Sequence, residues 1–247
     1  MRDMVAMGMV STIAAFVAGW MGGAAGIGGV LLVPALATIE RIPAHTSIAA
    51  ASVAFTVMGA LALLRFRAEG RPLVGDPGLL LAAAPGAALG GLLVHEVQAK
   101  HLLAAVGLML IASGLQGAVR PAAAPLPEPP PRALAFVGFF VGLGSAMTGT
   151  GGAVLLIPIL LALRQPLQPT IAMSIAIQLP IGGFATAAHA LAGAIEPVLA
   201  TQLSLSLVGG AVAGRWCADR VPVRLIRRFV TVLLLTVGLW ILWRPPL

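Results

Sequence analysis

Two stretches of this 247-residue chain share one pattern and decide how the rest of it is interpreted. The first is Gly26-Ile27-Gly28-Gly29-Val30-Leu31-Leu32-Val33-Pro34, and the second is Gly149-Thr150-Gly151-Gly152-Ala153-Val154-Leu155-Leu156-Ile157-Pro158. Each begins with G-x-G-G, continues with aliphatic residues and ends in proline, with one residue of difference in spacing. A run of small residues that ends in serine follows each copy, at Ser47–Ser52 and at Thr170–Ser174. The chain therefore contains an internal duplication.

The composition identifies the class of protein. Hydrophobic residues make up 59% of the chain and charged residues 9%, whereas soluble domains carry about 25% charged residues. So few charges cannot solvate a soluble surface, and so much apolar material excludes a disordered chain. The net charge of +7 arises from basic residues at the edges of apolar stretches, which is typical of membrane loops and not of a nucleic-acid-binding face. We expect an integral membrane protein.

Charged residues divide the chain into eight apolar stretches, and a membrane-crossing helix needs about 20 residues. The stretches are Met4–Ile39, Ile42–Leu64, Pro77–Val94, Leu102–Val119, Ala133–Leu163, Gln165–Ile195, Pro197–Gly214 and Phe229–Trp243. A proline-rich segment joins the fourth to the fifth, and such segments are extended and semi-rigid. We predict a first repeat at 1–120, a linker at 121–132 and a second repeat at 133–247.

Met4–Ile39 and Ala133–Leu163 are too long for one crossing and carry the glycines near their middle. If all eight stretches cross once, seven basic residues lie on one side and eight on the other; if both long stretches return as hairpins, the split becomes four against eleven. Because basic residues concentrate in cytoplasmic loops, the hairpins are favoured, with the eleven-residue side cytoplasmic and both termini outside. The predicted fold is an all-α membrane protein with two four-segment halves in inverted repeat. Each half opens with a glycine-broken re-entrant hairpin, as in many transporters.

The glycine turns are the predicted substrate site. A turn that precedes a helix leaves backbone N–H groups unpaired, and the helix dipole adds partial positive charge there. Two such turns facing each other would bind an anion without a buried Lys or Arg. The alternative is that the glycines only allow close helix packing. The predicted binding glycines are Gly26, Gly28, Gly29, Gly149, Gly151 and Gly152, with the hydroxyls of Thr148 and Thr150 beside the second turn.

Further polar residues recur after each turn. Ser52 and Thr56 are four residues apart, as are Ser174 and Gln178, so each pair shares one face of a helix. We predict that all four line the anion site, although a hydroxyl can instead bond the carbonyl of the preceding helical turn. Pro180, with the glycines that follow it, should kink or break its helix.

No catalytic or metal site is predicted. His95-Glu96 and His101 do not match H-E-x-x-H, because the second histidine follows six residues after the first. For His189 we favour an interfacial position over a role as gate or proton carrier. Ser145 lacks the following glycine of nucleophile motifs, and no carboxylate lies deep in a stretch. We therefore expect neither an enzyme nor a cofactor.

The duplicated G-x-G-G motif, with its proline and the following small residues, resembles the TauE/SafE family of bacterial permeases. The resemblance covers nearly the whole chain, and only the family's third consecutive glycine is replaced, by Val30 and Ala153. It implies transport of sulfite or an organosulfonate by a multi-pass protein of the bacterial inner membrane.

Physical considerations favour export of such an anion. With the cytoplasm negative, each negative charge that moves outward gains about 2.3 kcal/mol per 100 mV. Rocking of the inverted halves would open the site to each side in turn. Two alternatives stay open: an anion channel, and a membrane assembly component without transport. The expected partners are the small anion and the bilayer, without nucleic acid, and exposed glycine and alanine faces would permit a homodimer.

Overall fold

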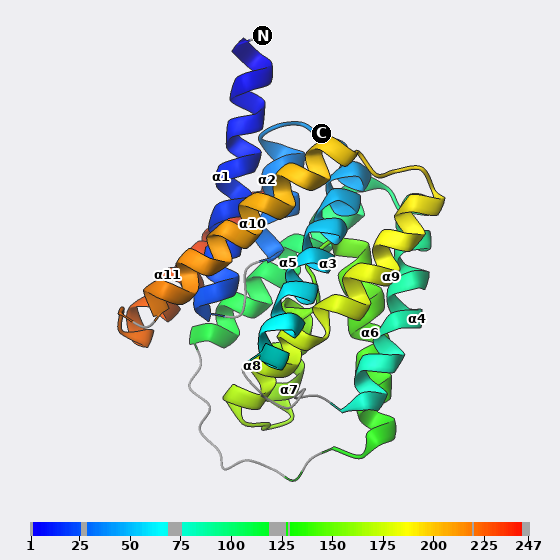
Figure 1. Cartoon of the computed structure of the whole chain (residues 1–247), viewed down its shortest axis with the longest axis vertical. Helices are drawn as coiled ribbons and strands as arrows, with labels where there is room; N and C mark the ends of the chain where they lie inside the picture. Colours follow the sequence, from blue (N-terminus) through cyan, green and yellow to red (C-terminus); the bar gives the residue numbers. More distant parts are fainter. Residues whose placement is uncertain are drawn as a thin grey trace.

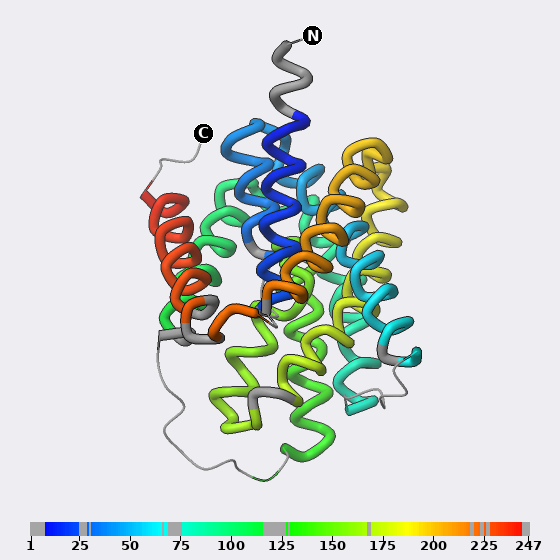
Figure 2. Tube along the Cα trace, turned by 60° about the vertical axis from the view of Figure 1, so that its left-hand side comes forward, coloured from blue at the N-terminus to red at the C-terminus, as the bar shows by residue number. Residues whose placement is uncertain are grey.

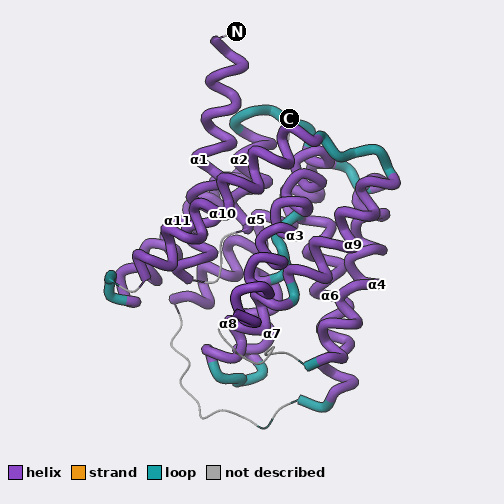
Figure 3. Tube along the Cα trace, in the orientation of Figure 1, coloured by secondary structure: helices purple, strands orange, loops and turns teal. Residues whose placement is uncertain are grey.

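The computed structural model describes residues 2–25, 29–68, 76–118, 127, 129–218 and 220–243. Within these residues every regular element is a helix and none is a strand (Figure 3). The Pro-rich linker predicted at 121–132 falls largely outside the described residues, as do Gly26 and Gly28 of the first glycine turn.

Long helices alternate with short ones both before residue 119 and after residue 130. The elements before residue 119 are α1 (Arg2–Ala25), η1 (Gly29–Leu31), α2 (Leu32–Thr38), α3 (Ala44–Ala68), α4 (Pro77–Leu93), η2 (Val94–Glu96) and α5 (Ala99–Ala118). Those after residue 130 are α6 (Pro131–Thr148), α7 (Ala153–Ala162), α8 (Leu167–Ala176), α9 (Gln178–Leu191), α10 (Pro197–Ala218) and α11 (Val223–Trp243).

Five segments of the described chain are long and apolar enough to cross a bilayer. They are Ala44–Arg65, Pro77–Glu96, Pro131–Thr148, Pro169–Leu191 and Pro197–Cys217. Large apolar side chains such as Leu81 and Leu205 are more than 70% exposed on them, which a lipid environment satisfies and water does not. The protein is a multi-pass membrane protein.

The second over-long apolar stretch is interrupted at its glycines, and in the first the described helix α1 ends at Ala25 while η1 begins at Gly29. The first contains α1 and then the short η1 and α2, and the second contains α6 and then α7. Figures 1 and 2 place α2 beside α1, toward the end of the molecule that carries the N-terminus, and α7 at the opposite end. Neither stretch is therefore one continuous helix.

Helices that lie far apart in the sequence form the closest pairs. The pairs are α1 with α10, α4 with α6, α5 with α11, α4 with α9 and α3 with α9. In two of them the backbones touch through glycines four residues apart: a Cβ on Gly86 or Gly90 of α4 would clash with the Phe139 or Leu143 carbonyl of α6. Glycines of α1 and α10 meet in the same way. Small residues give this close approach, because helix association within lipid depends on packing.

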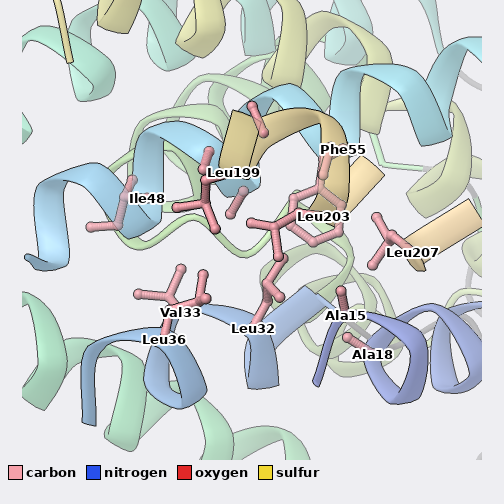
Figure 4. Packing of buried hydrophobic residues seen from close by; sticks show 14 of the residues in the cluster. Ala15, Ala18, Leu32, Val33, Leu36, Ile48, Phe55, Leu199, Leu203 and Leu207 are labelled. Carbon is pink, nitrogen blue, oxygen red and sulfur yellow. The ribbon is translucent and has the colours of Figure 1, made fainter. Parts of the chain in front are cut away.

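Three apolar clusters fill the interior, and the third of them joins α1, η1, α5, α7 and α11. Figure 4 shows the first, where α2 residues such as Leu32 and Leu36 face Ile48 and Phe55 of α3 and Leu203 of α10. The second joins α4, α6, α7, α8 and α9. The second glycine turn lies between the first two clusters. Phe55, which faces Gly151, belongs to the first cluster, and Ile181, which faces Gly152, belongs to the second.

The predicted break near Pro180 lies at Ile177, between α8 and α9. Pro180 is the third residue of α9, where its missing N–H falls among the unpaired donors of a first turn. Gly182 stays helical, and its role is a close contact: a Cβ there would lie 2.7 Å from the Thr56 nitrogen of α3.

Candidate functional site

The second glycine turn is a tight, buried reversal between α6 and α7. Gly149, Gly151 and Gly152 have φ values of +64°, +73° and +95°, which residues with a Cβ adopt only at a cost. A Cβ on Gly151 would lie 2.8 Å from the Phe55 ring, and one on Gly149 would lie 2.7 Å from Val33. No side chain caps the first turn of α7. The sequence needs glycine here for both the backbone conformation and the space.

The two threonines of this turn satisfy each other. Both side chains are buried, at 2% exposure for Thr148 and 1% for Thr150. The Thr148 hydroxyl donates to the Gly144 carbonyl at 2.7 Å, and its oxygen lies 3.1 Å from the Thr150 hydroxyl. Because a hydroxyl has one hydrogen, Thr150 donates to Thr148. Neither hydroxyl has a hydrogen left for a ligand in this conformation.

Gly29, the described glycine of the first motif, meets the second glycine turn in the interior. A Cβ on Gly29 would lie 2.5 Å from the Thr150 carbonyl oxygen and 2.5 Å from the Phe55 ring. Gly29 therefore approaches the backbone of the second turn directly, and the Phe55 ring, which is 4% exposed, fills the space beside this contact. Phe55 was not among the predicted site residues, although it is the first phenylalanine, tryptophan or tyrosine after the small-residue run Ser47–Ser52.

The other predicted site residues lie on α3, α8 and α9. The Ser52 and Ser174 hydroxyls are buried and donate to the Ile48 and Ile171 carbonyls of their own helices. Thr56 donates to the Ser52 carbonyl at 2.8 Å. These hydroxyls thus take the alternative role named above, that of bonding the preceding turn. Whether they also contact an anion stays a prediction.

Gln178 differs from the hydroxyl residues. Its side chain is 8% exposed, and its Oε1 atom has no hydrogen-bond partner. An unsatisfied buried amide is costly, so a ligand or water is its natural partner. Gln178 lines a cavity of about 90 Å³ between the inner ends of α1, α3, α8, α9 and α10.

Two arginines line the same cavity. Arg65 belongs to the last turn of α3, and Arg215 belongs to the last turn of α10. A cation at a helix C-terminus is favoured by the helix dipole, and a guanidinium binds oxyanions with two parallel hydrogen bonds. No sequence pattern links this pair, because the two residues are 150 positions apart in the chain (215 − 65). Only helix packing brings them to one cavity.

Three polar side chains of α9, which we call the polar row, are spaced between this cavity and the other end of the molecule. Gln178, Thr186 and His189 lie on one face of α9, and the Thr186 hydroxyl lies 3.1 Å from that of Thr56 on α3. His189 lies eleven positions after Gln178 on α9, a rise of roughly 16 Å. The interface of α3 and α9 thus carries polar groups through an apolar interior.

His189 does not occupy the interfacial position that we favoured. Its side chain is fully buried, and its Nδ1 atom lies 3.2 Å from Nε2 of His95. His189 lies in the last turn of α9, and His95 of η2 contacts it there, so its ring faces protein and not the lipid–water boundary. Among the described residues no group of three His, Cys, Asp or Glu side chains has the geometry to hold a metal ion.

The comparison with protein families accounts for nearly the whole chain. The family model of the sulfite exporter TauE/SafE matches residues 11–241. The chain belongs to the TauE/SafE family. Comparisons with curated proteins and with solved structures give no match. Because the TauE/SafE match spans both glycine turns and the helices that pack on them, the site lies within the part that defines the family. TauE/SafE proteins are membrane transporters of the sulfite exporter type.

Proposed function

We propose that this TauE/SafE protein exports a small sulfur-containing anion, sulfite or an organosulfonate, by alternating access around the two glycine turns. The observation that carries the proposal is the contact between the turns at Gly29 and Thr150, with Phe55 filling the gap. A contact of backbone against backbone in the interior forms a closed gate without a bound ligand. Its separation would expose backbone N–H groups to the anion.

We also propose that residues 1–120 and 133–247 are inverted repeats that open on re-entrant hairpins. The pairing of helices supports this relation, because α1 packs on α10 as α6 packs on α4. Each partner lies in the other half, and both pairs use glycines spaced by four residues. The opposite placement of α2 and α7 in Figure 1 agrees with hairpins entering from opposite sides.

The anion would enter at the arginine-lined cavity. Arg65 and Arg215 raise the local concentration of anions, and Gln178 offers an amide at the inner wall. From there the polar row of α9 leads past Thr56 to the turns. Ser52, Thr148, Thr150 and Ser174 complete the proposed lining once the halves move apart and their hydroxyls exchange partners.

Export follows from the charge of the substrate. With the arginine-lined end in the cytoplasm of a bacterial inner membrane, the potential moves the anion outward, with about 2.3 kcal/mol per charge at 100 mV. A coupling ion is then not required for net export. The gate must close between openings, since an open path would also pass other anions.

Flux into proteoliposomes tests the function directly. We expect saturable uptake of labelled sulfite and of a small sulfonate, with a rate that responds to an imposed potential. Flux that rises linearly with concentration, without stimulation by anion on the far side, would replace the permease by a channel. Folded protein without flux of either anion would contradict the proposal.

A pair of glycine variants separates the gate from general backbone strain. Gly151→Ala introduces a Cβ at φ +73° against the Phe55 ring, whereas Gly193→Ala introduces one at φ +64° with open space around it. Both pay the left-handed cost of about 1–2 kcal/mol. We expect loss of saturable transport only in Gly151→Ala, with membrane insertion retained in both variants. Equal transport in the two would remove the turn from the mechanism.

A further inference from the structure

Three histidines from three elements meet at the end of the molecule away from the arginine-lined cavity. His45 lies in the first turn of α3, His95 lies in η2 and His189 lies in the last turn of α9. The His95 ring lies 5.8 Å from that of His45 in a stacked arrangement and 5.3 Å from that of His189 edge-on. The His45 Nε2 atom lies 3.1 Å from the Val97 carbonyl oxygen. His95 is thus enclosed between one anchored and one buried imidazole.

The neutral His95–His189 pair can take up one additional proton. Nδ1 of His189 and Nε2 of His95 are 3.2 Å apart, so in the neutral pair one nitrogen donates the single shared hydrogen and the other accepts it. Nε2 of His189 is buried and has no partner. One added proton converts the donor ring to an imidazolium and strengthens the bond. A second proton would leave two donors facing each other, so the pair holds one proton.

The surroundings leave this proton without a dedicated counter-ion. Glu96 follows His95 on η2, and the His45 ring of α3 stacks on that of His95. Of the described parts of the other helices packed on α9, α4 and α8 carry no titratable side chain, and α6 has only Arg132 at its far end. Without an anion nearby the buried ring of His189 stays neutral, and an anion in the adjacent polar row would supply the missing counter-charge.

We propose that the His95–His189 pair is a proton-binding site whose charge attracts the transported anion at the outer end of the α3–α9 interface. The inference rests on the proposed function for the anion itself. Thr186 lies one turn before His189 on α9 and contacts Thr56, so the pair continues the row that starts at Gln178. Proton and anion then favour each other's binding reciprocally.

Transport of a sulfonate as a function of pH tests this linkage. A sulfonate stays anionic from pH 5 to 9, so a change in its flux reports on the protein and not on the substrate. If the anion binds only the protonated pair, its apparent affinity is reduced by the unprotonated fraction. We expect the KM of the unaltered protein to rise by up to about tenfold per pH unit above the titration midpoint of the pair.

Variants assign the effect to the pair. His189→Gln and His95→Gln should each flatten the pH profile of KM, and the second variant serves if the first does not fold. His101→Gln is the matched control, because His101 is an exposed histidine near the same end and should keep the steep profile. Steep profiles in both pair variants would overturn the proposal while leaving anion transport intact.

Titration of the imidazoles gives a readout that does not depend on flux. Nuclear magnetic resonance of the ring nitrogens in purified protein should show one proton bound per His95–His189 pair, with a midpoint that rises on addition of methanesulfonate. A midpoint unmoved by the sulfonate overturns the linkage even where flux is present. Absence of flux in every folded variant instead overturns the proposed function, and the linkage with it.

Discussion

At the residue scale, the ring of Phe55 fills the space between the two glycine turns. The turns bring backbone to backbone at Gly29 and Thr150, and the ring of Phe55 contacts Gly29 and Gly151 from α3. An aromatic ring is wide and rigid, so it seals a gap that small residues would leave open. Its position next to Thr56 also places it at the polar row.

Shortening this side chain should loosen the gate. We expect Phe55→Ala to raise passive leak of sulfite and to lower the saturable fraction of flux, because the cavity left behind connects the two turns. The control is Phe136→Ala, since Phe136 on α6 is 66% exposed. Proteoliposome leak without a potential measures the effect, and a Phe55→Ala protein as tight as the control would exclude Phe55 as a gate.

Glu40 is a buried carboxyl outside the membrane-spanning segments. It is 6% exposed, and the Ser11 amide donates to its Oε1 at 2.6 Å. Burial raises the pKa of Glu40, and the hydrogen bonds from Ser11 partly offset this. The folded protein therefore prefers the protonated acid. This contribution to stability is fully present below the ordinary glutamate pKa and is lost as the pH rises through the raised value.

A neutral replacement should remove that pH dependence. Glu40→Gln keeps the oxygen that accepts from Ser11, and we expect its unfolding temperature to gain on that of the unaltered protein as the pH rises from 4 to 8. Glu196→Gln is the control, because Glu196 is exposed. A constant difference between Glu40→Gln and the unaltered protein over this range would contradict the pKa shift.

At the element scale, glycines spaced by four residues decide which helices pair. On α10, Gly210 and Gly214 meet the Phe16 and Trp20 carbonyls of α1, whereas the neighbouring Gly209 has nothing within 4 Å of an added Cβ. In a bilayer such close contact contributes to association through packing. The glycine turns were predicted from the sequence, whereas the pairing of these helix faces was not, although the spacing of their glycines is visible in the chain.

Adjacent glycines of one helix provide a matched test. Gly210→Ala should separate α10 from α1 and destabilise the protein by about 1–3 kcal/mol through overpacking. Gly209→Ala should be neutral or slightly stabilising, since alanine favours the helix. Thermal unfolding in detergent measures both. The same tolerance at the two positions would mean that α1 and α10 are not held by this contact.

At the scale of the whole molecule, the described basic residues are unevenly distributed between its two ends. Arg41 and Lys100 lie beside the starts of α3 and α5. The other group lies at or near the opposite helix ends and consists of Arg65, Arg67, Arg132, Arg164, Arg215, Arg220 and Arg228. Cytoplasmic loops carry the excess of basic residues, so we propose that the richer end lies in the cytoplasm.

Cysteine labelling tests this orientation. In a background with Cys217→Ser, which removes the single native cysteine, cysteines replacing Gln98 or Ala192 should react with an impermeant reagent from outside. Cysteines replacing Leu163 or Pro222 should react only after the membrane is opened. The reverse pattern would invert the orientation, and mixed labelling of one end would contradict the hairpin interpretation.

The local properties of the chain were predictable to a large extent. Apolar stretches separated by charges predicted helices and a membrane protein, and the second over-long stretch breaks at its glycines. Gly149, Gly151 and Gly152 take the positive φ values that a turn requires. The alternative role of Ser52 and Ser174 was foreseen, because a hydroxyl bonds its own helix by local geometry alone.

What the sequence by itself determined is therefore the helical, membrane-spanning character of the chain and the break at the second glycine turn, since these depend on hydropathy and backbone conformation along the chain. The tertiary structure decided which side chains meet. Arg65 and Arg215 share a cavity, Phe55 fills the contact between the turns, and His95 meets His189, each across a long sequence separation. Such meetings depend on how helices cross, which small residues at distant interfaces set by close packing. No local pattern encodes them.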